Sequence, residues 1–214
     1  LLRLGRAKAV KDCDRWFRPA RPSSPVHNLL KTLAQIAVFW GFFLLLVPSG
    51  ILAVQNMLGI ETFQPGIFRA IAWFGFGIAG SVGLYCAFLF VVHGRGTPLP
   101  LDQTTRLIVL GPYRWVRNPM AICGLFQGVM VGIVLGSWPV VAYALLGGPA
   151  WHVLARPAEE RDLARRFGDD YTAYRSSVRN WVPCLRPYPM VCEGQKSLNH
   201  PSAPETRDSP ESFQ

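Results

Sequence analysis

The chain has 214 residues, of which 50% are hydrophobic and only 16% are charged, and its formal net charge is +9. So small a charged fraction cannot coat a soluble domain, and we expect an integral membrane protein. The positive charge indicates no nucleic-acid partner, because no basic patch interleaved with aromatic side chains accompanies it. The five cysteines have no CxxC spacing, which indicates neither a metal site nor a disulfide framework.

Stretches without Asp, Glu, Lys or Arg divide the chain, and they cover residues 32–60, 70–94 and 118–155. A helix crosses the hydrocarbon layer with about 20 mainly apolar residues. We therefore predict a first transmembrane helix at about 32–54, with a kink near Pro48, and a second at about 70–93.

The third uncharged stretch is too long for one crossing, since a helix over 118–155 would extend roughly 57 Å. Its middle reads Gly136-Ser137-Trp138-Pro139. Glycine ends helices, serine caps their first turn, and proline suits that turn. The stretch therefore predicts two antiparallel helices, at about 119–135 and 139–155. The expected fold is an all-α integral membrane bundle of about four transmembrane helices that ends in a helical hairpin.

Basic residues are concentrated before the first predicted span, in the 95–117 connection and after the fourth span, whereas the 54–69 loop has only Glu61 and Arg69. The positive-inside rule then places both termini and the 95–117 connection in the cytoplasm. We expect a short cytoplasmic amphipathic helix from Glu159 to Phe167, stopped by Gly168. The predicted organisation is a basic N-terminal segment (1–31), a membrane domain (32–186) and a disordered tail (187–214).

Charged residues are expected to meet at the cytoplasmic end of the hairpin. Arg156 and Glu160 are four residues apart and share a helix face, and Pro157 should bend the helix between them. The antiparallel hairpin returns this segment to the side chains that precede it, namely Tyr113, Arg114, Arg117 and Asn118. They would face Arg156, Glu159 and Glu160, a set that suits a ligand with amino, carboxylate and hydroxyl groups. An interfacial arginine with a solvated carboxylate is the alternative interpretation of Arg156 and Glu160.

Four motifs in order resemble the isoprenylcysteine carboxyl methyltransferase family, which includes related phospholipid methyltransferases. They are Gly-Thr-Pro at 96–98, Gly-Pro-Tyr-Arg-Trp-Val-Arg-Asn-Pro at 111–119, Arg-x-x-Glu-Glu at 156–160 and Phe-Gly-x-x-Tyr-x-x-Tyr at 167–174. The resemblance covers about 94–183. It implies a small helical membrane enzyme that uses S-adenosylmethionine and methylates a lipophilic acceptor.

The resemblance also implies roles for individual residues. The cofactor would be lined by Thr105, Arg106, Leu107, Ile108, Tyr113, Asn118, Pro119, Met120 and Ala121, and Glu160 would also contact it. Arg156 would lie beside the methyl acceptor, and Glu159 would be a second carboxylate that can take a proton from a neutral acceptor. The acceptor itself stays open between a carboxylate, an amine and a thiol.

The chain departs from the family at one motif. The family has Arg-His-Pro-x-Tyr where this chain has Arg117-Asn118-Pro119-Met120-Ala121. Asparagine cannot titrate near neutral pH as histidine does, and Ala121 removes a phenol. These departures make a non-catalytic membrane relative one alternative to a methyltransferase. An NADPH-dependent membrane reductase is the other, because the helical architecture does not exclude it.

Overall fold

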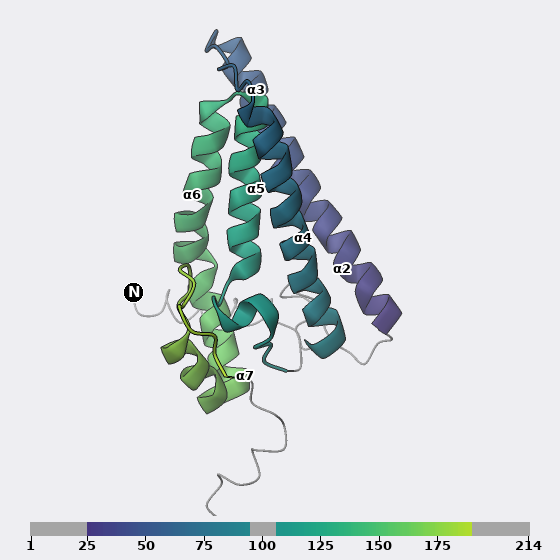
Figure 1. The fold of residues 1–214 in the computed structure, drawn as a ribbon, viewed down its shortest axis with the longest axis vertical. Coiled ribbons are helices and arrows are strands. Elements are labelled where there is room, and N and C mark those ends of the chain that lie inside the picture. The colour runs from purple at the N-terminus through teal and green to yellow at the C-terminus, as the bar shows by residue number, and fades with distance from the viewer. Residues whose placement is uncertain (1–24, 95–105, 190–214) are drawn as a thin grey trace, which may run out of the picture.

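The computed structural model describes residues 25–94 and 106–189, and the regular elements within these residues are all helical (Figure 1). This confirms the all-α class for the described part of the chain. The basic segment up to residue 24, Thr105 and the predicted tail from residue 190 onward lie outside the described residues.

The first helical run begins at Pro25 rather than at residue 32. It comprises α2 (Pro25–Trp40), a π-helical segment η1 (Gly41–Leu46) and α3 (Val47–Met57). The charge of Lys31 set the predicted start, but a lysine stem can lie along an apolar helix while its ammonium reaches polar surroundings. Instead of a kink at Pro48, the helix widens to the π form just before it. Proline supplies no N–H to the preceding turn and crowds its carbonyl, and a π segment accommodates both effects.

The predicted hairpin is confirmed as α5 (Pro119–Leu135) and α6 (Trp138–Leu154), packed beside α4 (Phe68–Gly94). Gly136 ends α5 in the left-handed conformation with φ 65°, and the Ser137 hydroxyl accepts the Val140 N–H at 3.3 Å. The two helices then run side by side (Figure 1). They approach closely because a Cβ built at Gly132 would lie only 2.6 Å from the Val141 side chain.

The outer surface of the bundle is apolar and indicates a membrane protein. Two helical runs, Val26–Met57 and Phe68–Gly94, are long and apolar enough to cross a bilayer. Large apolar side chains stand exposed along the helices, among them Phe42, Leu45, Phe74, Leu146 and Leu154. Each helix of the hairpin has 17 residues, a length of about 25 Å. That α5 and α6 also cross, and that both termini are cytoplasmic, stay predictions.

The helix after the hairpin is α7 (Arg156–Ser177), with Pro157 in its first turn instead of at a bend inside α6. It consists of two helical segments that meet at a kink, because Gly168 takes a non-helical conformation (φ 48°, ψ −123°). The predicted end of the first segment at Gly168 is confirmed, but this segment begins at Arg156 rather than at Glu159. The second segment was not predicted, and it brings three further polar side chains, Tyr171, Tyr174 and Arg175, to the site.

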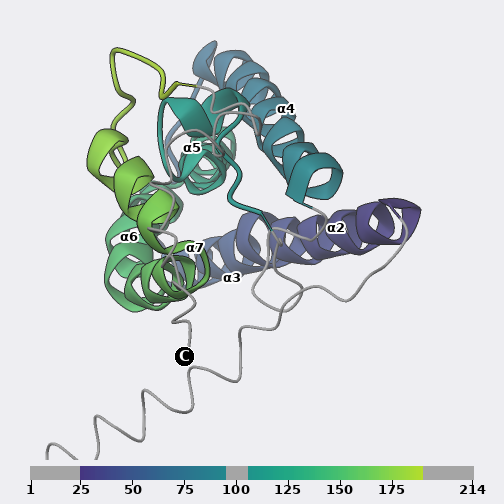
Figure 2. The same ribbon diagram turned by 90° about the horizontal axis from the view of Figure 1, so that it is seen from below.

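Seen from below, α7 and the chain that follows it lie beneath the helical bundle (Figure 2). This is the end at which α5 begins and α4 ends (Figure 1). A shallow hollow at the opposite end, lined in part by Asn56, Glu61 and Gln64, is remote from these charged residues.

Candidate functional site

The segment 107–110 leads to the site as an extended chain wedged between two apolar clusters. Leu107 and Val109 pack against the cluster of Tyr171, Tyr174 and Val178 from α7 and its end. Ile108 and Leu110 pack on the opposite side, against the cluster of Cys86, Leu89 and Tyr113. Successive side chains of an extended segment point to opposite sides, which explains the alternation. Leu107 and Ile108, both predicted to line a cofactor, thus face different clusters, and Arg106 before them is exposed.

Tyr113 lies in a 3-10 turn, η3 (Gly111–Arg114), directly after this segment. Its ring is buried and packs edge-on against Phe90, and its carbonyl accepts a 2.6 Å hydrogen bond from the Tyr174 hydroxyl. Burial raises the pKa of Tyr113 well above its ordinary value, and burial likewise raises the pKa of Tyr171 and Tyr174. These phenols therefore stay neutral and act as hydrogen-bonding and packing groups.

Asn118 stands at the N-cap of α5, where an asparagine usually bonds to the backbone of the first turn. Its side chain makes no such bond, and its amide Nδ2 is buried without a hydrogen-bond partner among the described residues. Pro119 opens the helix and is buried, Met120 packs against the Cys86 cluster, and Ala121 is half-buried. Of these four predicted cofactor residues, Asn118 is the one whose polar group lacks a described protein partner.

A network of ion pairs joins α7 to the start of α5, and Glu160 is its centre. The Oε1 of Glu160 accepts from Arg117 Nη1 at 2.9 Å and from Arg156 Nε at 3.1 Å, and its Oε2 pairs with Arg175 Nη2 at 3.1 Å. Arg156, only 3% exposed, also donates from Nη1 to Glu159 Oε2 at 3.2 Å. The predicted meeting of Arg117 with Arg156, Glu159 and Glu160 is confirmed.

The two carboxylates of this network differ in what they can do. Glu160 is held by three guanidinium groups, so little of its hydrogen-bonding capacity is left for a ligand. Among the described residues Glu159 pairs with Arg156 alone, and 38% of its side chain is exposed although protein atoms crowd the carboxylate. Burial raises the pKa of Glu159, the positive charge of Arg156 opposes that rise, and the negative charge of Glu160 adds to it. Glu159 is therefore the more accessible of the two carboxylates. Its raised pKa also makes it a stronger base than an ordinary glutamate carboxylate.

Residues 178–189, which we call the strap, fasten the chain end over the start of α5. The Arg117 N–H donates to the Arg179 carbonyl at 2.9 Å, and the Cys184 N–H donates to the Trp115 carbonyl at 2.8 Å. Arg114 Nε donates to the Tyr188 carbonyl at 2.7 Å. Arg114 was expected to face the carboxylates, but its described contact is to the strap.

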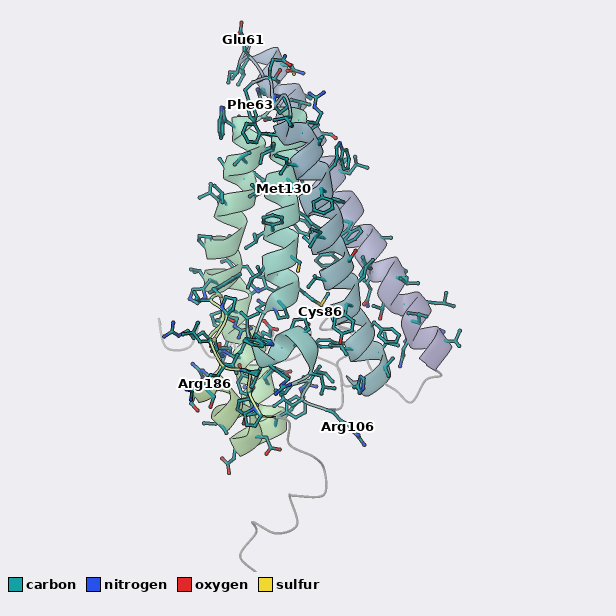
Figure 3. The ribbon with its side chains drawn as sticks, viewed as in Figure 1. Glu61, Phe63, Cys86, Arg106, Met130 and Arg186 are labelled. Atoms are coloured by element: carbon teal, nitrogen blue, oxygen red, sulfur yellow. The ribbon has the colours of Figure 1, made fainter. Side chains whose placement is uncertain are left out.

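Sequence reasoning assigned no role to several residues that complete the site. Tyr171 receives a long 3.4 Å hydrogen bond from Arg117 Nη1, and Arg175 pairs with Glu160. The signal was available: Tyr174 and Arg175 follow Tyr171 by three and four residues, which is helical spacing. Figure 3 shows nitrogen and oxygen atoms gathered at this end of the bundle, near the labelled Arg106 and Arg186.

Comparison with known proteins supplies one informative relative. The chain is 26% identical over 195 residues to the methanethiol S-methyltransferase of Pseudomonas deceptionensis, and the alignment covers 85% of this chain and 68% of that protein. No family model matches the chain, and no solved structure matches it. The similarity therefore extends over most of the chain rather than over a single motif.

Proposed function

We propose that the protein is a membrane methyltransferase that moves a methyl group from S-adenosylmethionine to a lipophilic or membrane-associated acceptor, and that the acceptor is a small thiol. The observation that carries the proposal is the ion-pair network at the foot of the hairpin, which joins the partly exposed Glu159 and Glu160 to Arg117, next in sequence to Asn118, whose Nδ2 has no partner among the described residues. The similarity to a protein named for S-methylation of methanethiol supports both the reaction and the choice of a thiol.

The polar groups of the site fit S-adenosylmethionine. The amino-acid part of that molecule carries an ammonium and a carboxylate. Glu159, with one described guanidinium partner, can accept hydrogen bonds from the ammonium. Arg117 Nε and Asn118 Nδ2, both buried without described partners, can donate to the carboxylate. When bound, the cofactor supplies a methyl group already activated by its sulfonium.

The protein has to orient the acceptor, exclude water and receive a proton. Arg156, buried and fixed by both carboxylates, would hold an anionic sulfur or oxygen near the methyl group. Glu159 would take the proton of a thiol while the new carbon–sulfur bond forms and the methyl–sulfonium bond breaks. The products are a thioether and S-adenosylhomocysteine. Asn118 cannot serve as the base, because its amide does not titrate.

The test uses membranes that contain the protein, S-adenosylmethionine labelled in its methyl group, and methanethiol, a long-chain thiol, a lipid amine or a prenylated cysteine as acceptor. We expect label in the thioether of a thiol, and less label with Glu159→Gln even at S-adenosylmethionine concentrations that saturate the variant. Label in none of the products, together with no binding of S-adenosylhomocysteine, would overturn the proposal. Thermal protection by NADPH instead would support a reductase.

A further inference from the structure

Asn180, in the strap, has an amide group with neither end satisfied. Its Nδ2 and its Oδ1 are both buried, and no hydrogen-bond partner for either occurs among the described residues. Buried amides are normally paired, because an unpaired donor or acceptor costs about 1–3 kcal/mol.

The residues on both sides of Asn180 are anchored, one through its backbone and the other through its side chain. Before it, the Arg179 carbonyl accepts the Arg117 N–H at 2.9 Å. After it, Trp181 Nε1 donates to His152 Nδ1 at 3.2 Å, which ties the strap to the end of α6. A residue between two such anchors has little freedom to turn away, and its side chain is pre-organised for a ligand.

The same anchors place Asn180 beside the other unsatisfied groups of the site. The hydrogen bond from Arg117 to Arg179 sets residues 117–118 alongside residues 179–180. Arg117 Nε and Asn118 Nδ2 are also buried without described partners. These unsatisfied groups belong to three residues on two adjoining segments, so they point to one polar ligand. The unsatisfied buried atoms of Arg117 and Asn118 are donors, whereas Asn180 has an unsatisfied donor and an unsatisfied acceptor on one rigid group.

A donor and an acceptor side by side match the N6/N7 edge of adenine. The N6 amino group donates, the neighbouring N7 accepts, and an asparagine amide pairs with both at once. We propose that Asn180 binds this edge of the adenine of S-adenosylmethionine and makes the site selective for adenine. The inference rests on the proposed function. It assigns the adenine to the strap, while Glu159, Arg117 and Asn118 hold the amino-acid end.

The experiment compares three ligands on the purified full-length protein by calorimetric titration. They are S-adenosylhomocysteine, its 7-deaza analogue, which lacks the N7 acceptor, and its inosine analogue, which has a carbonyl in place of the N6 amino group. We expect the wild-type protein to bind each analogue roughly tenfold to a hundredfold more weakly than the adenine form. Asn180→Ala should bind all three with nearly equal, reduced affinity.

A second variant separates the two hydrogen bonds. Asn180→Asp keeps the acceptor for N6 and loses the donor to N7, so it should still reject the inosine analogue but no longer distinguish the 7-deaza analogue. Asn56→Ala is the matched control, because it makes the same change at an exposed site at the opposite end of the bundle and should retain the wild-type preferences.

The outcomes separate the inference from the function. If the wild-type protein binds none of the three ligands, the proposed function is wrong. If it binds them but prefers adenine by less than about twofold, or if either Asn180 variant keeps both wild-type preferences, the assignment of Asn180 is wrong and the function stands. Should Asn180→Ala not fold, the Asn180→Asp titration decides alone.

Discussion

Replacing Glu160 by glutamine tests whether the ion-pair network holds the site together. The change keeps the size of the side chain but removes the charge that Arg117, Arg156 and Arg175 share, and it turns one oxygen into a donor that faces a guanidinium. Arg175 is 54% exposed, so its pair contributes at most about 1 kcal/mol. Arg117 and Arg156 are 11% and 4% exposed at their side chains, and breaking a buried pair costs about 3–5 kcal/mol. Because Arg156 keeps Glu159, we expect a total loss of about 3 kcal/mol.

The loss can be measured by denaturant unfolding in detergent micelles, followed by tryptophan fluorescence. Asp162→Asn is the matched control, since Asp162 forms an ion pair with Arg166 at 2.8 Å on the same helix and is about as buried as Glu160. We expect that control to lose less stability than Glu160→Gln, because Glu160 is shared by three guanidinium groups among the described residues. Glu160→Gln should also weaken S-adenosylhomocysteine binding under conditions in which it is folded, because Arg117 loses its orientation. Equal stabilities of the two variants, with unchanged ligand binding, would refute the reasoning.

Three further predictions use the same unfolding assay. Gly136→Ala should destabilise the protein by about 2–3 kcal/mol, because the added Cβ would collide with the Phe63 carbonyl oxygen at a position with left-handed backbone. Gly59 is also left-handed but has open space around it, so Gly59→Ala should cost about 1 kcal/mol. Similar losses at both glycines would show that the collision is relieved. Tyr174→Phe should cost about 1–2 kcal/mol, because the buried Tyr113 carbonyl loses its donor, and no measurable change would contradict that hydrogen bond. The pKa of Glu159 is raised in the folded state, so between the two pKa values the folded protein binds more protons than the unfolded protein. The stability of the wild-type protein should therefore fall as pH rises from the ordinary glutamate pKa of 4.5 to the raised pKa of the folded state. Glu159→Gln should remove that fall, and a pH profile identical to that of the wild type would show that another group causes it.

What the sequence predicts correctly is what local chemistry determines. The turn at Gly136 and Ser137 needs only a residue that tolerates positive φ and a hydroxyl that caps a helix, and the sequence shows both residues directly. The pairing of Arg117 with Glu160 follows once that turn is known, because a hairpin returns its ends to each other. The ion pair is thus a consequence of topology, and topology was predictable here.

What the sequence did not predict at the site depends on contacts between distant segments. Gly168 interrupts α7 as expected, but the local sequence does not show that Tyr171 and Tyr174 beyond it pack against Leu107 and Val109. The hydrogen bonds of the strap were not predicted for the same reason. Three of them join backbone groups of the strap to those of residues 114–117, and backbone groups carry no signature in the sequence.

The charge of the network bears on which acceptor the site favours. Arg117, Arg156 and Arg175 contribute three positive charges and Glu159 and Glu160 two negative ones, so the network carries one net positive charge. Proton transfer to Glu159 raises this to two, at the moment when a thiol becomes a thiolate. The growing positive charge stabilises an anionic acceptor and opposes the positive charge that a methylated amine acquires. The physical expectation is therefore a thiol or carboxylate acceptor rather than an amine, in agreement with the thiol acceptor that we propose.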